Sequence, residues 1–202
     1  MAYSGTIDTT NSLAGDSLDL VKEFLSISGS GTNDILALYI NAASEFCNYY
    51  CGAGASPRLL RARAITEYYS GDGSNAILPR QYPINSITSL HDDIDRVYGS
   101  DTELYADGDI IIENDNTRIR YYGGSFAHGM NNIKLIYNAG YSTIPAVLQL
   151  ACLEIVRFFY QDSEEKRAGI TTRSMADGSL GIMESRIPKD TLLKLEPYGR
   201  KW

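Results

Sequence analysis

The residues best suited to chemistry in this sequence are its two histidines, His91 and His128, and the polar groups beside them. His91 precedes Asp92, Asp93 and Asp95, and such a set of donors could hold a divalent cation. The spacing lacks the glycine at the sixth position and the closing glutamate of a calcium-binding loop. We therefore interpret this run as a solvated acidic turn.

Ser125 stands three residues before His128, an arrangement that could suggest a nucleophile and its general base. The G-x-S-x-G pattern fails here because Ala127 takes the place of the second glycine. Members of a catalytic triad meet through the fold, so proximity in the sequence is no argument for one. A small hydrolase built on this segment or on the Asp92 cluster stays a minor alternative, and no cofactor is predicted.

The three cysteines do not indicate a metal centre or a disulfide framework. Cys47 and Cys51 are one helical turn apart, but no second cysteine pair or nearby histidine completes a zinc site. With Cys152 their number is odd, which suits a protein made in a reducing cytosol. Gly29-Ser-Gly31 precedes a helix, as phosphate-binding loops do, but it follows a helix and no Lys-Ser or Lys-Thr pair comes after it.

Composition narrows the class of protein further. A chain of 202 residues with 44% hydrophobic content can bury a core. A net charge of −7 argues against binding nucleic acid through its phosphates. No apolar run approaches the roughly 20 residues of a membrane-spanning helix, and the start of the sequence does not resemble a secretory signal. We expect a soluble globular protein that is not an enzyme.

The elements that must position these residues are helices near both ends with strands between them. Apolar spacing predicts helices over 16–27, 34–51 and 144–161, and short alternating runs predict an antiparallel β region over about 59–141. The expected fold is α+β, a small helical bundle of about three to four helices with an inserted antiparallel β region. The candidate strands are 61–69, 84–91, 109–113, 118–122 and 132–138.

The remaining segments flank a predicted domain of residues 16–161. Residues 1–15 are small and polar and are predicted to form a flexible arm, and the Gly/Ser/Thr-rich range 162–186 a mobile loop. Residues 187–202 form an apolar tail that docks either onto its own subunit or onto another protein. The helices 34–51 and 144–161 have more apolar surface than one partner would cover, so we expect them to be buried on most sides.

Several short motifs, in this order, resemble the head–tail connector (adaptor or head-completion) proteins of tailed bacteriophages over roughly residues 16–161. The motifs are Leu18-Asp-Leu-Val-Lys-Glu-Phe-Leu25, Ala42-Ala-Ser44, Tyr68-Tyr-Ser-Gly-Asp-Gly73, Leu78-Pro79 with Tyr82-Pro-Ile84, and Tyr137-Asn-Ala-Gly-Tyr141 leading to Ile144-Pro145.

The resemblance implies a structural virion protein that assembles as a homo-oligomeric ring, commonly a dodecamer, beneath the portal protein. Such a ring extends the DNA channel and docks the next neck or tail protein; DNA passes without specific binding, and no membrane is involved. The protein would act in the neck of the virion after assembly in the host cytoplasm. An acidic channel lining would let the duplex slide. The alternative within the same class is a stopper or tail-completion protein.

Two sets of residues are candidates for these contacts. Fifteen tyrosines are many for this length, and they suit either contact surfaces or a β-rich core. A cluster of arginines, which could also be a solvated strand end, joins two of these tyrosines as the candidate ring interface: Arg58, Arg61, Arg63, Tyr68 and Tyr69. The candidates for docking to the portal or another neighbour are Leu192, Leu193, Leu195, Tyr198 and Trp202.

Overall fold

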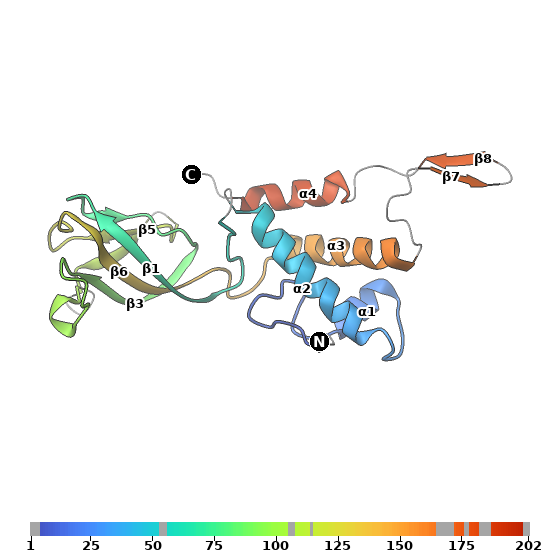
Figure 1. Ribbon diagram of the computed structural model, residues 1–202, viewed down its shortest axis with the longest axis horizontal. Coiled ribbons are helices and arrows are strands. Elements are labelled where there is room, and N and C mark those ends of the chain that lie inside the picture. The colour runs from blue at the N-terminus through green and yellow to red at the C-terminus, as the bar shows by residue number, and fades with distance from the viewer. Residues whose placement is uncertain are drawn as a thin grey trace. The chain divides into compact units, whose positions relative to one another are not determined.

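The chain folds into two compact units, one helical and one built of strands. The computed structural model describes residues 5–52, 56–104, 108–113, 115–164, 172–175, 178–181 and 187–199. The helical unit comprises Met1–Arg58 and Ile144–Trp202, and the β unit comprises Leu59–Thr143 (Figure 1). The β unit is thus an insertion between two helical stretches, which confirms the predicted α+β fold class.

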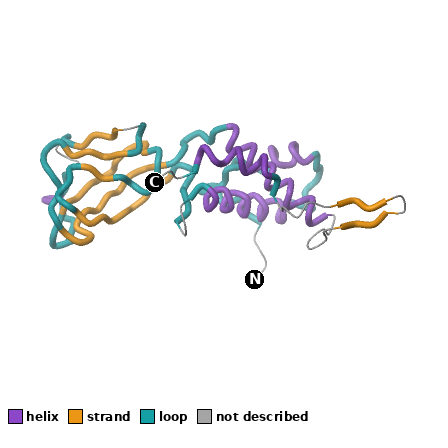
Figure 2. The backbone as a smooth tube through the Cα atoms, turned by 90° about the horizontal axis from the view of Figure 1, so that it is seen from above, coloured by secondary structure: helices purple, strands orange, loops and turns teal. Residues whose placement is uncertain are grey.

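The described residues of the helical unit form four α-helices. They are α1 (Asp19–Leu25), α2 (Asn33–Tyr50), α3 (Ala146–Glu164) and α4 (Lys189–Leu195), and the short 3₁₀ helix η3 (Glu196–Tyr198) follows α4. Figure 2 shows the helices in purple and the strands in orange. A two-stranded hairpin of β7 (Thr172–Met175) and β8 (Gly178–Gly181) lies within the range predicted to be a mobile loop. The rest of that range after Glu164 lies outside the described residues, apart from this hairpin.

The two long helices pack on each other through one face of each. Small and branched apolar residues recur at helical spacing on these faces, which lets the two backbones approach. The buried residues of α2 and α3 that form this core are Leu36, Ala37, Ile40, Ala43, Cys47, Leu148, Ala151, Cys152, Ile155 and Val156.

The segment before α1 is packed against α2, contrary to the predicted flexible arm. Leu13 is fully buried, and its backbone N–H donates to Ser44 Oγ at 3.0 Å. Asn41 accepts from the N–H of Asp8 at 2.9 Å and donates to the carbonyl of Thr6 at 3.0 Å. The composition of residues 1–15 did not predict this packing, because the groups that hold the segment are polar side chains of α2, Asn41 and Ser44. Residues 1–4 of the predicted arm lie outside the described residues.

The described part of the β unit forms two antiparallel three-stranded sheets with strand orders β1-β6-β3 and β2-β5-β4. A single hydrophobic cluster that includes Ile87, Ile119, Phe126 and Leu135 takes residues from both sheets. The short helix η1 (Ser100–Thr102) follows β3. The strands are β1 (Arg63–Gly71), β2 (Ala76–Ile77), β3 (Ile84–Asp92), β4 (Ile110–Glu113), β5 (Arg118–Tyr121) and β6 (Gly129–Ala139).

Strand β6 is the centre of the larger sheet and pairs with β1 on one side and β3 on the other. Its residues Ile133, Leu135, Tyr137 and Ala139 are buried, and the residues between them are partly exposed. This alternation confirms the prediction of a strand with one buried face.

The two chain segments that bound the β unit pair with each other. The N–H of Tyr141 donates to the carbonyl of Leu60 at 2.8 Å, and the N–H of Ala62 donates to the carbonyl of Tyr141 at 3.1 Å. Gly140 has a positive φ of 108°, and a Cβ there would meet the backbone of Arg61 at 2.7 Å. The Asn-Ala-Gly-Tyr motif thus requires its glycine for conformation and for close approach.

Candidate assembly surfaces

The acidic run after His91 is committed to its own loop. The carboxylate of Asp93 accepts hydrogen bonds from the backbone N–H groups of Asp95, Val97 and Tyr98 at 2.7–2.9 Å. These bonds, first of all the one from Tyr98, hold the pKa of Asp93 below its ordinary value. The His91 Nδ1 lies 3.2 Å from the carbonyl of Gly99. The carboxylate therefore organises a turn, as predicted, but the turn is not fully solvated, because His91 and Asp93 are buried.

Asp92 takes part in a separate network around a buried asparagine. Its two oxygens accept from the N–H of Ala127 at 2.6 Å and from Asn132 Nδ2 at 2.7 Å. Asn132 is almost fully buried, and its Oδ1 accepts from the N–H of Gly71 at 2.8 Å. The network joins β1, β3 and β6 to the loop before β6, and the sequence reasoning did not anticipate it.

Ser125 and His128, the pair considered as a nucleophile and its base, do not form such a pair. Ser125 and His128 are both exposed, and no hydrogen bond joins them within the described part of the chain. The ring of His128 lies beside Gly73, where a Cβ would meet its Nε2 at 2.6 Å. The geometry therefore does not activate Ser125 as a nucleophile.

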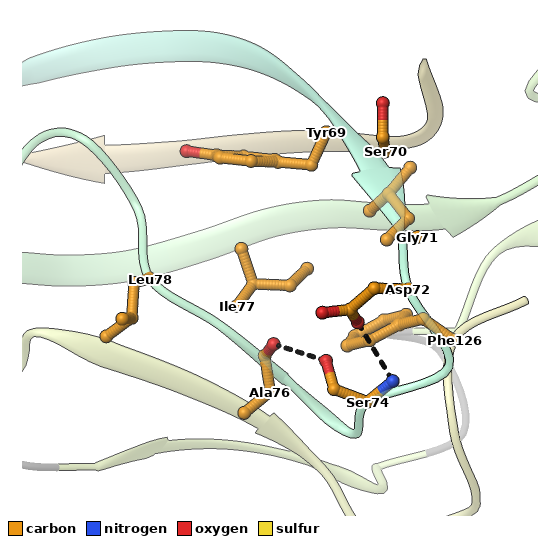
Figure 3. A pocket seen from close by; sticks show the side chains of 10 residues that line it. Tyr69, Ser70, Gly71, Asp72, Ser74, Ala76, Ile77, Leu78 and Phe126 are labelled. Carbon is orange, nitrogen blue, oxygen red and sulfur yellow. Dashed lines mark hydrogen bonds between the residues drawn. The ribbon is translucent and has the colours of Figure 1, made fainter. Parts of the chain in front are cut away.

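A pocket of about 140 Å³ lies between the end of β1 and strand β2, beside the loop that contains Phe126 (Figure 3). Ile77, Phe126 and Ile133 line it with apolar groups. At its polar side, the Ser74 N–H donates to Asp72 Oδ1 at 2.9 Å and the Ser74 hydroxyl donates to the carbonyl of Ala76 at 3.2 Å (Figure 3). These polar groups are thus engaged with one another.

The cysteines are buried free thiols in the helical core. The contact with the Cys152 thiol, together with burial, raises the pKa of Cys47, and burial raises the pKa of Cys51 to about 11. Both thiols are therefore protonated at neutral pH and are poor nucleophiles or metal ligands. Among the described residues, no three His, Cys, Asp or Glu side chains gather in a way that could hold a metal ion.

A buried carboxylate stabilises the loop after β2. Glu67 on β1 accepts a hydrogen bond from the Tyr69 hydroxyl, one from the Tyr137 hydroxyl at 2.9 Å, and one from the N–H of Arg80 at 3.2 Å. The hydroxyl of Tyr137 also accepts from the N–H of Gln81 at 3.2 Å. This network fixes residues 80–81 on the sheet and accounts for two of the many tyrosines as core residues.

The candidate ring residues occupy different environments. Arg58 is only 2% exposed, and its guanidinium donates to the backbone carbonyl of Tyr198 within the helical unit. Arg61 and Arg63 are half-buried at the start of β1, and Tyr69 is bonded to Glu67. Tyr68 is exposed and its ring lies 5.6 Å from that of Tyr98. Of this set, Tyr68 offers the most accessible surface, and Arg58 has a structural role inside the subunit.

The candidate docking tail is partly built into the core. Leu195 is fully buried and its carbonyl accepts a hydrogen bond from the Cys51 thiol at 3.6 Å. Leu193 is 47% exposed, while Leu192 and Tyr198 are half-buried. Trp202 lies outside the described residues. A deletion of 187–202 would therefore remove part of the helical core, since Thr191 and Leu195 are both buried.

Large apolar side chains remain exposed on the outer faces of the two long helices. Ile35, Leu38 and Tyr49 are exposed on α2, and Val147 and Leu150 on α3. In the β unit, Ile94 and Val97 project from the loop after β3 with exposed fractions of 65% and 78%. The expectation that the long helices are buried on most sides is thus not met within one subunit. Such exposed apolar surface is typical of protein contact sites.

Taken together, the polar clusters of the described residues stabilise the subunit itself, and several large apolar side chains are left exposed. The Head completion protein family model matches residues 17–179. The chain belongs to this family. The match confirms the predicted class, the head–tail connector or head-completion proteins of tailed bacteriophages.

A solved structure of the neck of an empty GTA particle, computed with C6 symmetry, contains a chain of similar fold. The TM-score is 0.59 at 16% sequence identity, and the alignment covers 98% of this chain and 92% of that chain. A comparison with curated proteins yields no match. In the part of the chain that the structure describes, none of the helices has the length and hydropathy needed to cross a membrane.

Proposed function

We propose that this protein is a structural component of the virion neck that assembles as a ring beneath the portal protein. The ring, a dodecamer, extends the DNA channel and docks the next neck or tail protein. Membership of the head completion family is the main support for the proposal, because the match over residues 17–179 includes all of the β unit and much of the helical unit. The similar chain comes from a particle neck treated with C6 symmetry, and a twelve-copy ring is compatible with that symmetry.

The exposed apolar faces of α2 and α3 support assembly into a ring. In an assembled ring, neighbouring subunits would cover the apolar helix surface that one subunit leaves exposed. A subunit in a ring must cover two different lateral patches, and the two helices provide one each. The polar clusters described above are occupied by internal hydrogen bonds, so the surfaces, and not a catalytic centre, are the parts available to other molecules.

The net charge of −7 suits a protein that lines a DNA channel. Acidic side chains in the lining would repel the phosphates and let the duplex slide. A ring structure whose channel is lined chiefly by arginine and lysine would contradict this part of the proposal.

Electron microscopy of negatively stained particles tests the function directly. The full chain is mixed with its cognate portal protein at several salt concentrations, beside each component alone. We expect an additional ring at one end of the portal. Separate particles under all conditions would overturn the connector function. A ring that joins only a portal already carrying another neck protein would favour a stopper or tail-completion protein.

A point substitution tests the docking tail without removing its buried residues. Leu193→Gln takes an exposed apolar side chain off α4, and Lys189→Gln, also exposed on α4, is the matched control. We expect the first variant to lose portal binding and the second to keep it. Equal binding by both variants would exclude Leu193 from the docking surface.

A further inference from the structure

The loop after β3, residues 93–99, presents aliphatic side chains to solvent. Ile94 is 65% exposed, and Val97, at 78%, is the most exposed large apolar side chain in the described part of the protein. Apolar surface of this kind is typical of contact sites. Covering Val97 with another molecule would remove that surface from water, which is favourable.

The backbone of this loop is held in one conformation. The carboxylate of Asp93 accepts hydrogen bonds from three of its N–H groups, and the Tyr98 hydroxyl donates to the carbonyl of Asn131. Arg96 and Tyr98 have positive φ angles of 60° and 56°, which residues other than glycine seldom adopt unless surrounding contacts impose them. A loop that is fixed beforehand loses little conformational entropy on binding, so its tip is prepared for a contact.

The pocket between the end of β1 and strand β2 has the size and lining to receive one such side chain (Figure 3). Its volume of about 140 Å³ is close to that of an apolar cavity of roughly 150 Å³, which can hold benzene. Phe126 and Ile133 line it and are themselves buried, and Leu78 in its lining is 53% exposed. Because an isopropyl group is smaller than benzene, the side chain of Val97 fits this volume.

The loop and the pocket lie on opposite faces of the larger sheet. In the register of β1 and β6, Tyr68 is paired with Lys134. The neighbouring pair, Tyr69 with Ile133, points to the other face, because consecutive residues of a strand alternate. The ring of Tyr98 in the loop lies 5.6 Å from the ring of Tyr68 and 5.3 Å from Lys134 Nζ, on the first face. Tyr69 and Ile133 line the pocket, on the second face. Neighbours in a ring are related by a small rotation, so each copy can offer its loop to the pocket of the next.

The charges at the loop tip and at the pocket are complementary. Arg96 at the tip is exposed, as is Asp72 in the pocket lining. Hydrogen bonding with Ser74 is the main cause that holds the pKa of Asp72 below its ordinary value, so this carboxyl is ionised at neutral pH. The tip also carries Asp95, and the guanidinium of Arg80 lies 5.7 Å from the ring of a tyrosine that lines the pocket. Each of the two surfaces thus has one acidic and one basic group.

We propose that Val97 of one copy inserts into this pocket of the next copy, with Arg96 opposite Asp72; this inference rests on the proposed ring. The contact joins the β unit of one copy to the β unit of another, so it adds to any contact through the apolar helix faces. Because the loop and the pocket are different surfaces, the contact is heterologous and repeats from copy to copy until a ring closes.

Disulfide cross-linking between two populations of the full chain tests the contact. One population carries Val97→Cys, and the other, enlarged by a terminal tag, carries Leu78→Cys; the native cysteines are buried. The populations are mixed and oxidised with the cognate portal and without it. We expect about tenfold more mixed dimer, in at least one of the two conditions, than when Ile111→Cys replaces Leu78→Cys. Ile111 is a matched control, since it is 48% exposed on β4. Equal yields from the two pairs in both conditions would overturn the inference.

A charge exchange tests the pairing of Arg96 with Asp72. We expect Arg96→Glu and Asp72→Arg each to lower the fraction of portals that carry a ring in electron micrographs, because each places like charges at the contact, and the double variant to restore it. Asp109→Arg and Lys189→Glu, exposed elsewhere, are control charge reversals that should leave this fraction unchanged. An unchanged fraction in both single variants, or no recovery in the double variant, would contradict the pairing.

The two experiments separate this inference from the proposed function. If wild-type chains form rings on the portal but the Val97→Cys pair gives no more mixed dimer than its control, the ring stands and the contact between β units fails. If that pair gives the expected excess while the portal gains no ring, the copies meet as inferred and the portal-binding function fails.

Discussion

The guanidinium of Arg58 donates a hydrogen bond to the backbone carbonyl of Tyr198, which lies 140 residues further along the chain. The N–H of Arg58 also donates to the carbonyl of Asn48 at 2.9 Å, near the end of α2. Arg58 therefore ties the chain that leaves α2 to the turn that follows α4. Arg58 was predicted to contact a neighbouring subunit. It instead joins two segments of its own subunit that are far apart in the sequence.

Replacing Arg58 should loosen the end of the described chain. Arg58→Met keeps most of the buried length of the side chain but removes its donors, and losing such a charged hydrogen bond costs about 1.5–3 kcal/mol. We expect faster amide hydrogen exchange in α4 and η3, measured by mass spectrometry. The exposed control Lys189→Met should leave the exchange of both elements unchanged. Unaltered protection in Arg58→Met would show that the bond is not needed there.

The Tyr137 hydroxyl should contribute to the stability of the β unit. Tyr137→Phe removes a donor to Glu67 and an acceptor for the N–H of Gln81, leaving buried polar groups with fewer partners. We expect a loss of about 1–3 kcal/mol in the free energy of unfolding in urea. Tyr122→Phe is the matched control, because its hydroxyl donates to Glu113 at the surface, and it should change nothing measurable. Equal midpoints for both variants would contradict the expectation.

Stability should fall in alkaline solution. Burial, and then the nearby Glu67, raises the pKa of both Tyr69 and Tyr137 above the ordinary tyrosine value. The unfolded chain loses these protons near pH 10, where the folded chain retains them, so the unfolded state binds fewer protons and stability declines with rising pH. The contribution is fully present below about pH 10. Urea midpoints should drop more steeply above that pH in wild type than in Tyr137→Phe; parallel curves would refute the assignment.

Asn132 should tolerate no acidic replacement. Asn132→Asp puts a carboxylate next to Asp92 and removes the amide that donates to Asp92 and to the carbonyl of Ala127. We expect a loss of at least about 2 kcal/mol at neutral pH, with partial recovery near pH 4, where one carboxyl is protonated and can donate. Asn131→Asp, one residue away and exposed, adds the same charge as a control. Thermal unfolding at both pH values decides between them.

The sequence predicts the regular parts of this fold well, because they follow hydrophobic periodicity. Strand β6 is an example, since Ile133, Leu135 and Tyr137 alternate with partly exposed residues as expected. Strand β2 has two residues, Ala76 and Ile77, too few for any period to be visible. Its position depends on pairing with Ile119 and Arg120, which only the folded chain brings near.

The contact surfaces were harder to foresee. Arg58 and Leu195 were chosen as candidate contact residues from their residue types, but both are buried. Their burial depends on packing between segments far apart in the sequence, which composition does not reveal. On α2, likewise, only burial separates exposed apolar residues such as Ile35 from core residues such as Leu36.

The backbone pairing of Leu60 and Ala62 with Tyr141 means that the chain leaves for the strands and returns from them at one place. The segment from about residue 63 to residue 139 is an insertion whose two ends are held together. Its length therefore does not alter the distance between the points where the chain leaves and re-enters the helical unit. Strands can therefore be lengthened, shortened or exchanged there without moving α2 or α3. The fold therefore permits the β unit to diversify while the helical unit keeps its geometry.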